Sequence, residues 1–245
     1  MSVVIDGSGG ITTNSGTVVS TTDATISGLT VGKGAGSDTY STVVGYSALS
    51  GSNTAQNNNA FGYQALTSNT TGPRNSAFGR ASLTANTTGY DNTGFGHASL
   101  ASTTTGASNT GIGSGALQSN TTASNNTAVG YQAGYTNTTG TGNVFLGYQA
   151  GYTANAAASS GWNVCVGFQS GYALTTGIAN TFVGAAGYNG ASGSAITTGT
   201  RNSILGAYSG NQGGLDIRTS SNYIVLSDGD GNPRIYNSGT NTIND

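Results

Sequence analysis

Few side chains in this sequence could carry acid–base, nucleophilic or metal chemistry. His97 is the only histidine, and it stands where other repeats have Tyr63 and Arg80, which predicts a surface position rather than a catalytic one. Cys165 is the only cysteine, and its apolar surroundings predict a small buried hydrophobe that cannot form a disulfide within the chain. The repeat region contains no pair of carboxylates, which a glycosidase would need. We therefore expect no catalysis and no cofactor.

Three oxygen-bearing side chains near the C-terminus resemble the opening of a calcium-binding loop. Asp228, Asp230 and Asn232 have the spacing of the first ligands of such a loop. However, the sixth position is Pro233 rather than glycine, and the twelfth is Gly239 rather than glutamate. The pattern therefore predicts the turn of a β-hairpin and no metal site.

Aromatic residues recur at one position of a repeat and could form an outward ladder that binds a glycan. Aromatic rings are amphipathic, so packing between coils or between chains is the alternative interpretation. The candidate glycan-binding residues are Tyr46, Tyr63, Tyr131, Tyr148 and Phe168, with Trp162 in an inserted loop.

These residues belong to a short motif that recurs about ten times between Ser41 and Gly210 and is most regular at Asn58–Leu66. Six successive intervals between its pivotal glycines are 17 residues long, and the next three are 20, 17 and 22, which predicts insertions around Ala157–Gly161 and Gly190–Gly199. Such a period indicates stacked layers, and we predict an all-β chain with a parallel β-solenoid or β-roll of about ten coils. The pivotal glycines are Gly45, Gly62, Gly79, Gly96, Gly113, Gly130, Gly147, Gly167, Gly184 and Gly206.

Three positions before the glycine predict how each coil packs. The residue just before it is always a sizeable hydrophobe, from Val44 to Leu205, which we expect to form an internal column. Four residues before it stands an asparagine in nine of the ten repeats, which we expect to bond to the backbone at a turn and along the stack.

Two residues before the glycine the side chains are small in early repeats and mostly large in later ones. Because adjacent strand residues point to opposite faces, both faces should be covered, and a thin coil could cover the second face only with another copy of the chain. The predicted homotrimer interface consists of Ala60, Ala77, Gly94, Gly111, Ala128, Phe145, Cys165, Phe182 and Ile204.

The repeat changes half-way along. A leucine four residues after the glycine, as in Leu66, becomes glycine followed by tyrosine from Gly134 onwards, which predicts a change in cross-section near residue 130. We divide the chain into an N-terminal cap or attachment segment (1–38) with short strands at 3–5, 16–19 and 25–31, a repeat shaft (39–210) and a C-terminal hairpin cap (211–245). At about 4.8 Å per layer, the shaft should be about 50 Å long.

Composition excludes several partner classes. With 42 glycines, 6% charged residues and a net charge of −2, the chain has no electrostatic footprint for nucleic acid or anionic membranes. It has neither a collagen triplet period nor an apolar stretch long enough to span a membrane, and its first residues lack the features of a secretory signal.

The units Asn58–Leu66 and Asn126–Gly134, the lead-in Gly28–Gly36 and the tail Val225–Asn232 together resemble bacteriophage tail-fibre proteins, especially those of marine and cyanobacterial phages. The repeat is also similar, more loosely, to the head of trimeric autotransporter adhesins, a left-handed parallel β-roll. The resemblance implies a homotrimer in the virion, assembled in the host cytoplasm, that contacts tail or baseplate proteins and a glycan or protein receptor on the host.

Three functions follow as hypotheses. The first is a structural tail-fibre segment, shaft or tip, that takes part in host attachment. The second is an extracellular or cell-surface adhesin. The third is an ice-binding solenoid, although the threonines, such as Thr70 and Thr71, are adjacent rather than alternating along one strand face.

Overall fold

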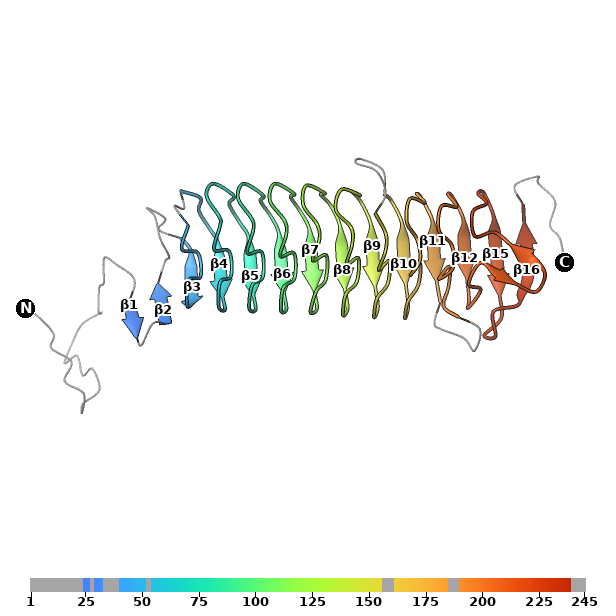
Figure 1. Ribbon diagram of the computed structural model, residues 1–245, viewed down its shortest axis with the longest axis horizontal. Helices are drawn as coiled ribbons and strands as arrows, with labels where there is room; N and C mark the ends of the chain where they lie inside the picture. Colours follow the sequence, from blue (N-terminus) through green and yellow to red (C-terminus); the bar gives the residue numbers. More distant parts are fainter. Residues whose placement is uncertain are drawn as a thin grey trace, which may run out of the picture.

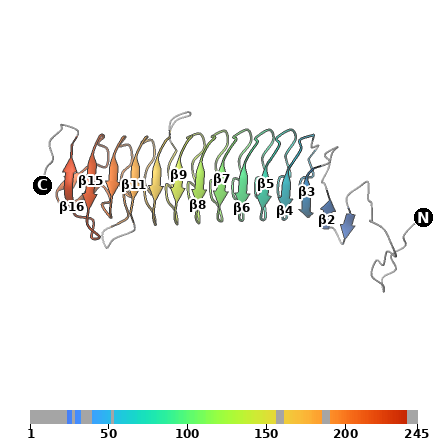
Figure 2. The same ribbon diagram turned by 180° about the vertical axis from the view of Figure 1, so that it is seen from behind.

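The computed structural model describes residues 24–26, 29–32, 40–51, 54–155, 161–184 and 190–238. Within these ranges the chain is all-β and forms a parallel β-solenoid, which confirms the predicted fold class. Figures 1 and 2 show its strands in single file along one rod. The strands predicted at residues 3–5 and 16–19 lie outside the described residues.

Each coil contributes one short strand to a continuous sheet. The strands of the repeat are β3 (Thr42–Gly45), β4 (Asn59–Phe61), β5 (Ser76–Phe78), β6 (Thr93–Phe95), β7 (Thr110–Ile112), β8 (Thr127–Val129), β9 (Val144–Leu146), β10 (Val164–Val166), β11 (Thr181–Val183) and β12 (Ser203–Leu205).

The register confirms the period read from the sequence. Paired Cα atoms from β3 to β9 are 17 residues apart, and Cys165 of β10 pairs with Phe145, 20 residues earlier. The second insertion was misplaced, because residues 192–197 pair regularly with the preceding coil, as in the bond from the Gly171 amide to the Ser192 carbonyl (2.9 Å). The extra residues of this coil therefore fall between Gly184 and Gly190.

The pivotal glycine turns the chain out of the strand. Its φ angle is strongly positive in each coil for which a value is given, for example +135° at Gly62. A Cβ atom there would lie only 2.6 Å from the carbonyl oxygen of Gly79, so the stacked backbones leave no room for a side chain. Two residues later, Gln64 also has a positive φ of 58°, which continues the turn towards the interior.

The interior lies on the opposite side of the strand from the one predicted. The column of hydrophobes just before each glycine faces outward, and Phe95 and Leu205 are 56% and 57% exposed. The prediction of an internal column was therefore wrong, because the turn at the glycine wraps the chain over the other face of the strand.

The residues predicted to form the trimer interface line this interior instead, and we call them the inner column. Phe145 and Phe182 are completely buried within a single chain. A side chain without exposed surface cannot contact another copy, so this assignment is corrected: one coil covers the column with its own return segment. The same holds for Ala60, Ala77, Gly94, Gly111, Ala128, Cys165 and Ile204.

The return segment packs on the inner column in two ways. In early coils a buried leucine, such as Leu100, covers a small residue, and a Cβ atom on Gly111 would lie 3.1 Å from the Leu100 Cγ atom. In later coils Gly134 and Gly151 replace the leucine, and Cβ atoms there would lie 2.6 and 2.3 Å from the Phe145 ring. The predicted change near residue 130 is thus an exchange of volume across the core.

The asparagine column forms a buried ladder, as predicted. Asn109 illustrates its bonds: its Oδ1 atom accepts from the Asn126 amide (3.0 Å), its Nδ2 atom donates to the Ala123 carbonyl (2.8 Å), and its own amide donates to the Asn92 Oδ1 atom (3.0 Å). Because buried polar groups need partners, this ladder satisfies turn backbone that the strands leave unpaired.

Antiparallel strands extend both ends of the sheet. At the N-terminal end, β1 (Ala24–Ile26) pairs with β2 (Leu29–Gly32), which pairs with β3. At the other end, β15 (Ile224–Ser227) pairs in parallel with β12 as an eleventh layer and forms the predicted hairpin with β16 (Pro233–Asn237). A second small hairpin joins β13 (Asn211–Gln212) and β14 (Leu215–Asp216).

Candidate binding surfaces of the rod

The outward hydrophobes of the sheet form a row that we call the apolar stripe. Its rings stack in the early coils, with centroids 4.8 Å apart for Phe61 and Phe78 and 5.5 Å apart for Phe78 and Phe95. A shallow apolar depression of about 240 Å³ lies over its last layers, between Val183 and Leu226. The stripe comprises Val44, Phe61, Phe78, Phe95, Ile112, Val129, Leu146, Val166, Val183, Leu205 and Leu226.

The predicted aromatic ladder exists, but it is interrupted. Tyr46 stacks on Tyr63 (5.5 Å), and Tyr148 stacks on both Tyr131 (5.4 Å) and Phe168 (5.1 Å). All five rings are exposed. Because the rings stack on one another, their shared faces are covered, so a ligand would meet mainly ring edges and hydroxyl groups.

Trp162 does not join this ladder. It precedes β10, whereas Phe168 follows the same strand, so the two side chains stand at opposite edges of the sheet. Trp162 is 59% exposed. The six aromatic candidates therefore do not form one site.

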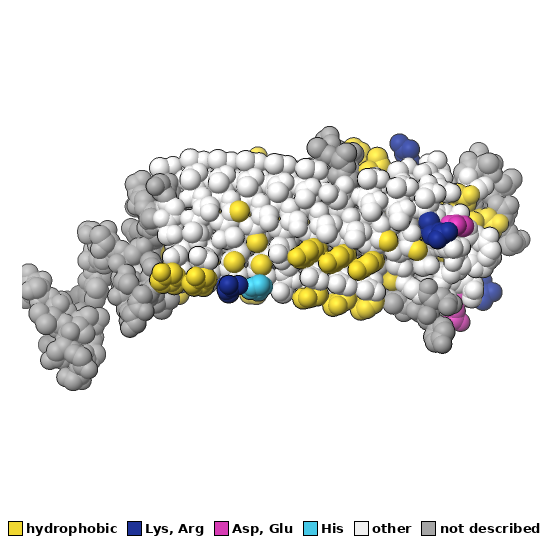
Figure 3. Space-filling model, in the orientation of Figure 1, with side chains coloured by type: hydrophobic (Ala, Val, Ile, Leu, Met, Phe, Trp, Pro, Cys, Tyr) yellow, Lys and Arg dark blue, Asp and Glu magenta, His cyan; other side chains and the backbone are white. Residues whose placement is uncertain are grey.

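Two further ladders run beside the later part of the aromatic ladder. Tyr152 stacks between Tyr135 (5.3 Å) and Tyr172 (5.2 Å), and Gln149 links Gln132 and Gln169 through amide hydrogen bonds of 2.9 and 3.0 Å. Rows of hydrophobic side chains are visible along this face of the rod in Figure 3. The recurring Gln and Gly-Tyr in the later repeats were the signals for these ladders, which the sequence reasoning did not interpret as a surface.

Arg80 and His97 occupy the gap in the aromatic ladder. The guanidinium of Arg80 lies 5.8 Å from the centroid of the Tyr63 ring, and its Nη1 atom lies 2.9 Å from the His97 Nε2 atom. Both side chains are exposed, as expected for His97. The gap therefore carries a cation in place of a ring.

In two of the threonine pairs, the hydroxyl of the first threonine bonds to the next coil, whereas the second threonine, Thr71 or Thr88, is exposed. The hydroxyl of Thr70 donates to the carbonyl of Thr87 (3.0 Å), and the hydroxyl of Thr87 donates to the carbonyl of Thr104 (3.0 Å). These hydroxyls thus stabilise the stack.

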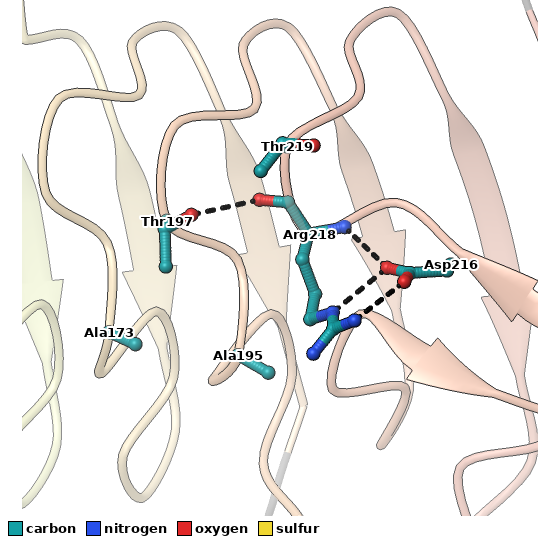
Figure 4. A pocket seen from close by; sticks show the side chains of 6 residues that line it. All are labelled: Ala173, Ala195, Thr197, Asp216, Arg218 and Thr219. Atoms are coloured by element: carbon teal, nitrogen blue, oxygen red, sulfur yellow. Dashed lines mark hydrogen bonds and ion pairs between the residues drawn. The ribbon is translucent and has the colours of Figure 1, made fainter.

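The cleft of about 530 Å³ near the C-terminal end is shown in Figure 4. Its charged wall is the pair Asp216 and Arg218, joined by two hydrogen bonds of 3.0 and 2.7 Å between their side chains. The hydrogen bond from Arg218 lowers the pKa of Asp216, so this carboxylate is not poised as a proton donor near neutral pH. Its other walls are Ala173, Ala195, Thr197 and Thr219.

The turn that contains Asp228, Asp230 and Asn232, between β15 and β16, is closed by hydrogen bonds to its own backbone. Asp228 Oδ1 accepts from the amides of Asp230 (3.0 Å) and Asn232 (2.9 Å), and Oδ2 accepts from the Arg234 guanidinium (2.8 Å). The hydrogen bonds from the Asn232 amide and, to a smaller extent, the Arg234 guanidinium lower the pKa of Asp228. The carboxylate that resembled the first calcium ligand therefore holds a hairpin turn.

Groups for nucleophilic or metal chemistry are not gathered in the described part of the chain. Burial raises the pKa of the Cys165 thiol, which disfavours the reactive thiolate. Within the described ranges, His, Cys, Asp and Glu do not form a group of three or more that could hold a metal ion, and no helix is long and apolar enough to cross a membrane.

No protein-family model, curated protein or solved structure gives a significant match to this chain.

Proposed function

We propose that the chain is a non-enzymatic structural segment of a tail fibre, and that copies of it assemble side by side into a rod that takes part in attachment to a host cell. The observation that carries this proposal is the apolar stripe. It extends over eleven layers, from Val44 to Leu226, on the outer face of a continuous sheet.

A second copy of this chain is the partner that best fits the stripe. The stripe is narrow and repeats with every layer, so a partner of the same length and spacing covers it most completely. Between Asn92 and Thr200 the chain has no charged residue, so copies can meet there without burying an unpaired charge. Three sheets facing a common axis would cover three stripes at once, which favours the trimer.

The number of exposed hydrophobes supports association along the whole rod. Monomeric proteins rarely expose long contiguous apolar patches, and such patches mark interaction sites. Fully burying one large hydrophobe stabilises by about 1.5–3 kcal/mol. Partial burial of a whole row therefore gives enough free energy to offset the cost of association, even if each layer contributes little.

Light scattering coupled to size-exclusion chromatography tests the assembly. We expect the full chain to elute at three times its own mass. Phe95→Glu combined with Leu205→Glu should dissociate the rod into monomers that keep their β-type circular dichroism, since both side chains are exposed in the single chain. A wild-type chain that stays monomeric at high concentration would contradict the proposed assembly.

The attachment role needs a separate experiment. Fluorescently labelled rods should bind cells of the host and block adsorption of the corresponding phage, whereas the dissociated variant should bind weakly because it has lost multivalency. Assembled rods that are absent from purified virions would argue against the tail-fibre role and favour a free-standing adhesin.

A further inference from the structure

Arg80 differs from three other arginines of the described chain in what it faces. Arg74, Arg218 and Arg234 each pair with a carboxylate, from Asp91, Asp216 and Asp228. Arg80 has no carboxylate partner among the described residues; instead it lies over an aromatic ring and against an imidazole. Its positive charge is thus not neutralised by a carboxylate of the described residues.

The two contacts of Arg80 hold its guanidinium in place. Arginine has donors but no acceptor, so Nη1 donates and the His97 Nε2 atom accepts at 2.9 Å. Tyr63 supports the group from the preceding coil through a cation–π contact at 5.8 Å. The remaining N–H groups of the fork have no hydrogen-bond partner among the described residues.

We infer that Arg80 is the centre of a binding site for the carboxylate or sulfate of an acidic saccharide. A guanidinium fork matches such groups with two parallel hydrogen bonds. The exposed rings of Tyr46 and Tyr63 flank it on one side, and their edges and hydroxyls can contact the sugar that carries the anion.

The surroundings favour a saccharide over nucleic acid. Nucleic-acid affinity grows with the number of phosphates neutralised, and this gap in the ladder offers a single arginine. The nearest ion pair in the sequence, Arg74 with Asp91, precedes β5 and β6, whereas Arg80 and His97 follow these strands. One fixed cation beside aromatic rings suits one acidic group on a mostly neutral polymer.

Binding of dextran sulfate, with unsulfated dextran of equal length as the reference, tests the site in the full chain by titration calorimetry at low salt. We expect the sulfated polymer to bind and the neutral one to bind at least about tenfold more weakly, since hydrogen bonds to a charged group are stronger than those to a neutral one. Arg80→Gln should weaken binding of the sulfated polymer by a similar factor, and Arg80→Lys should weaken it by less.

Arg201→Gln is the matched control. It also removes one exposed arginine, but this residue precedes β12 and lies outside the aromatic ladder. We expect it to keep wild-type affinity, and equal unfolding temperatures will show that all variants are folded. Equal losses in the Gln variants of Arg80 and Arg201, no loss in Arg80→Gln, equal binding of neutral dextran, or tighter binding of DNA would each overturn the inference. Because single-site affinity does not need the rod to assemble, its failure is distinguishable from that of the proposed function.

Discussion

The early and late coils of the solenoid fill the same interior with different residues. In the early coils a leucine such as Leu100 spans the interior and meets Gly111; in the late coils Phe145 spans it from the strand and meets Gly134 and Gly151. Protein interiors are packed to nearly constant density, so a large residue on one wall requires a small one on the other. Each coil therefore keeps the same core volume rather than the same residue type.

The polar content of the core changes at the same place. A second buried column is polar in the early coils, with Asn86 and Asn120 as examples, and it becomes apolar from Ala154 to Ile217. The asparagine ladder beside the strands continues through both halves, from Asn58 to Asn202. Only this ladder is needed in every coil, since it accepts hydrogen bonds from backbone amides of the next coil.

Exchanging the packing of one late coil for that of an early coil should give the largest effect. Phe145→Ala alone leaves a cavity and should lower the free energy of unfolding by about 3–5 kcal/mol. Gly151→Leu alone should cost a similar amount, because a Cβ atom there overlaps the Phe145 ring. The double variant should cost less than the sum, because the leucine fills the cavity; Leu66 shows that leucine tolerates the required positive φ (53°). Urea unfolding of all four chains gives the coupling energy.

The reverse exchange in an early coil is the matched control. Leu100→Gly with Gly111→Phe should also be less destabilising together than the two single changes predict. If the costs simply add in both halves, the idea that the two walls share one volume is wrong.

Truncating one asparagine in each of the two polar columns should show that the asparagine ladder contributes more to stability than the second column. Asn109→Ala removes an acceptor for the Asn126 amide and a donor to the Ala123 carbonyl, so it should cost about 2–4 kcal/mol. Asn120→Ala removes a donor to the same carbonyl (3.1 Å) but no acceptor of a backbone amide, so about 1 kcal/mol is expected. Thermal unfolding of the two variants under one condition measures the difference, and equal losses would contradict the special role of the asparagine ladder.

Substitutions of exposed residues of the apolar stripe should change the unfolding free energy equally little in the early and the late coils. Phe95→Ser and Leu205→Ser change one stripe residue in each half, and the two side chains are exposed to the same degree. Each should shift the unfolding free energy of the dissociated chain by about 0.5 kcal/mol or less, because few packing contacts are lost. A large loss at either position, measured in urea at low protein concentration, would show that the stripe belongs to the core of the single chain.

The smallest expected effect is the chemical labelling of the Cys165 thiol in the folded chain. Burial raises the pKa of Cys165, so iodoacetamide at pH 8 should label it only after unfolding. Ser114→Cys provides a more accessible thiol in the early half and should react rapidly. Fast labelling of Cys165 in the folded chain, followed by mass spectrometry, would contradict its place in the inner column.

The sequence was sufficient for the period, the parallel coils, the asparagine ladder and the stacking of Tyr131 on Tyr148, because these depend on identity at a fixed spacing. It was not sufficient for the inward face of the strand. Phe145 and Leu146 are adjacent and both apolar, so alternation alone cannot say which one the return segment covers. The inverse relation in size between the inner column and the leucine or glycine opposite it contained that information. The contacts of Arg80 could not be predicted from the sequence, because its partners Tyr63 and His97 come from neighbouring coils.

Cross-linking of two variants, each with a new cysteine at one of two neighbouring strand positions, tests most directly whether copies meet at the apolar stripe. Ala128 and Val129 are neighbours in β8, the first completely buried and the second 36% exposed. In assembled rods, Val129→Cys should form cross-links between chains with a short bismaleimide, whereas Ala128→Cys and the native Cys165 should form none. Cross-links through Ala128→Cys, with none through Val129→Cys, would contradict the account and return the interface to the inner column.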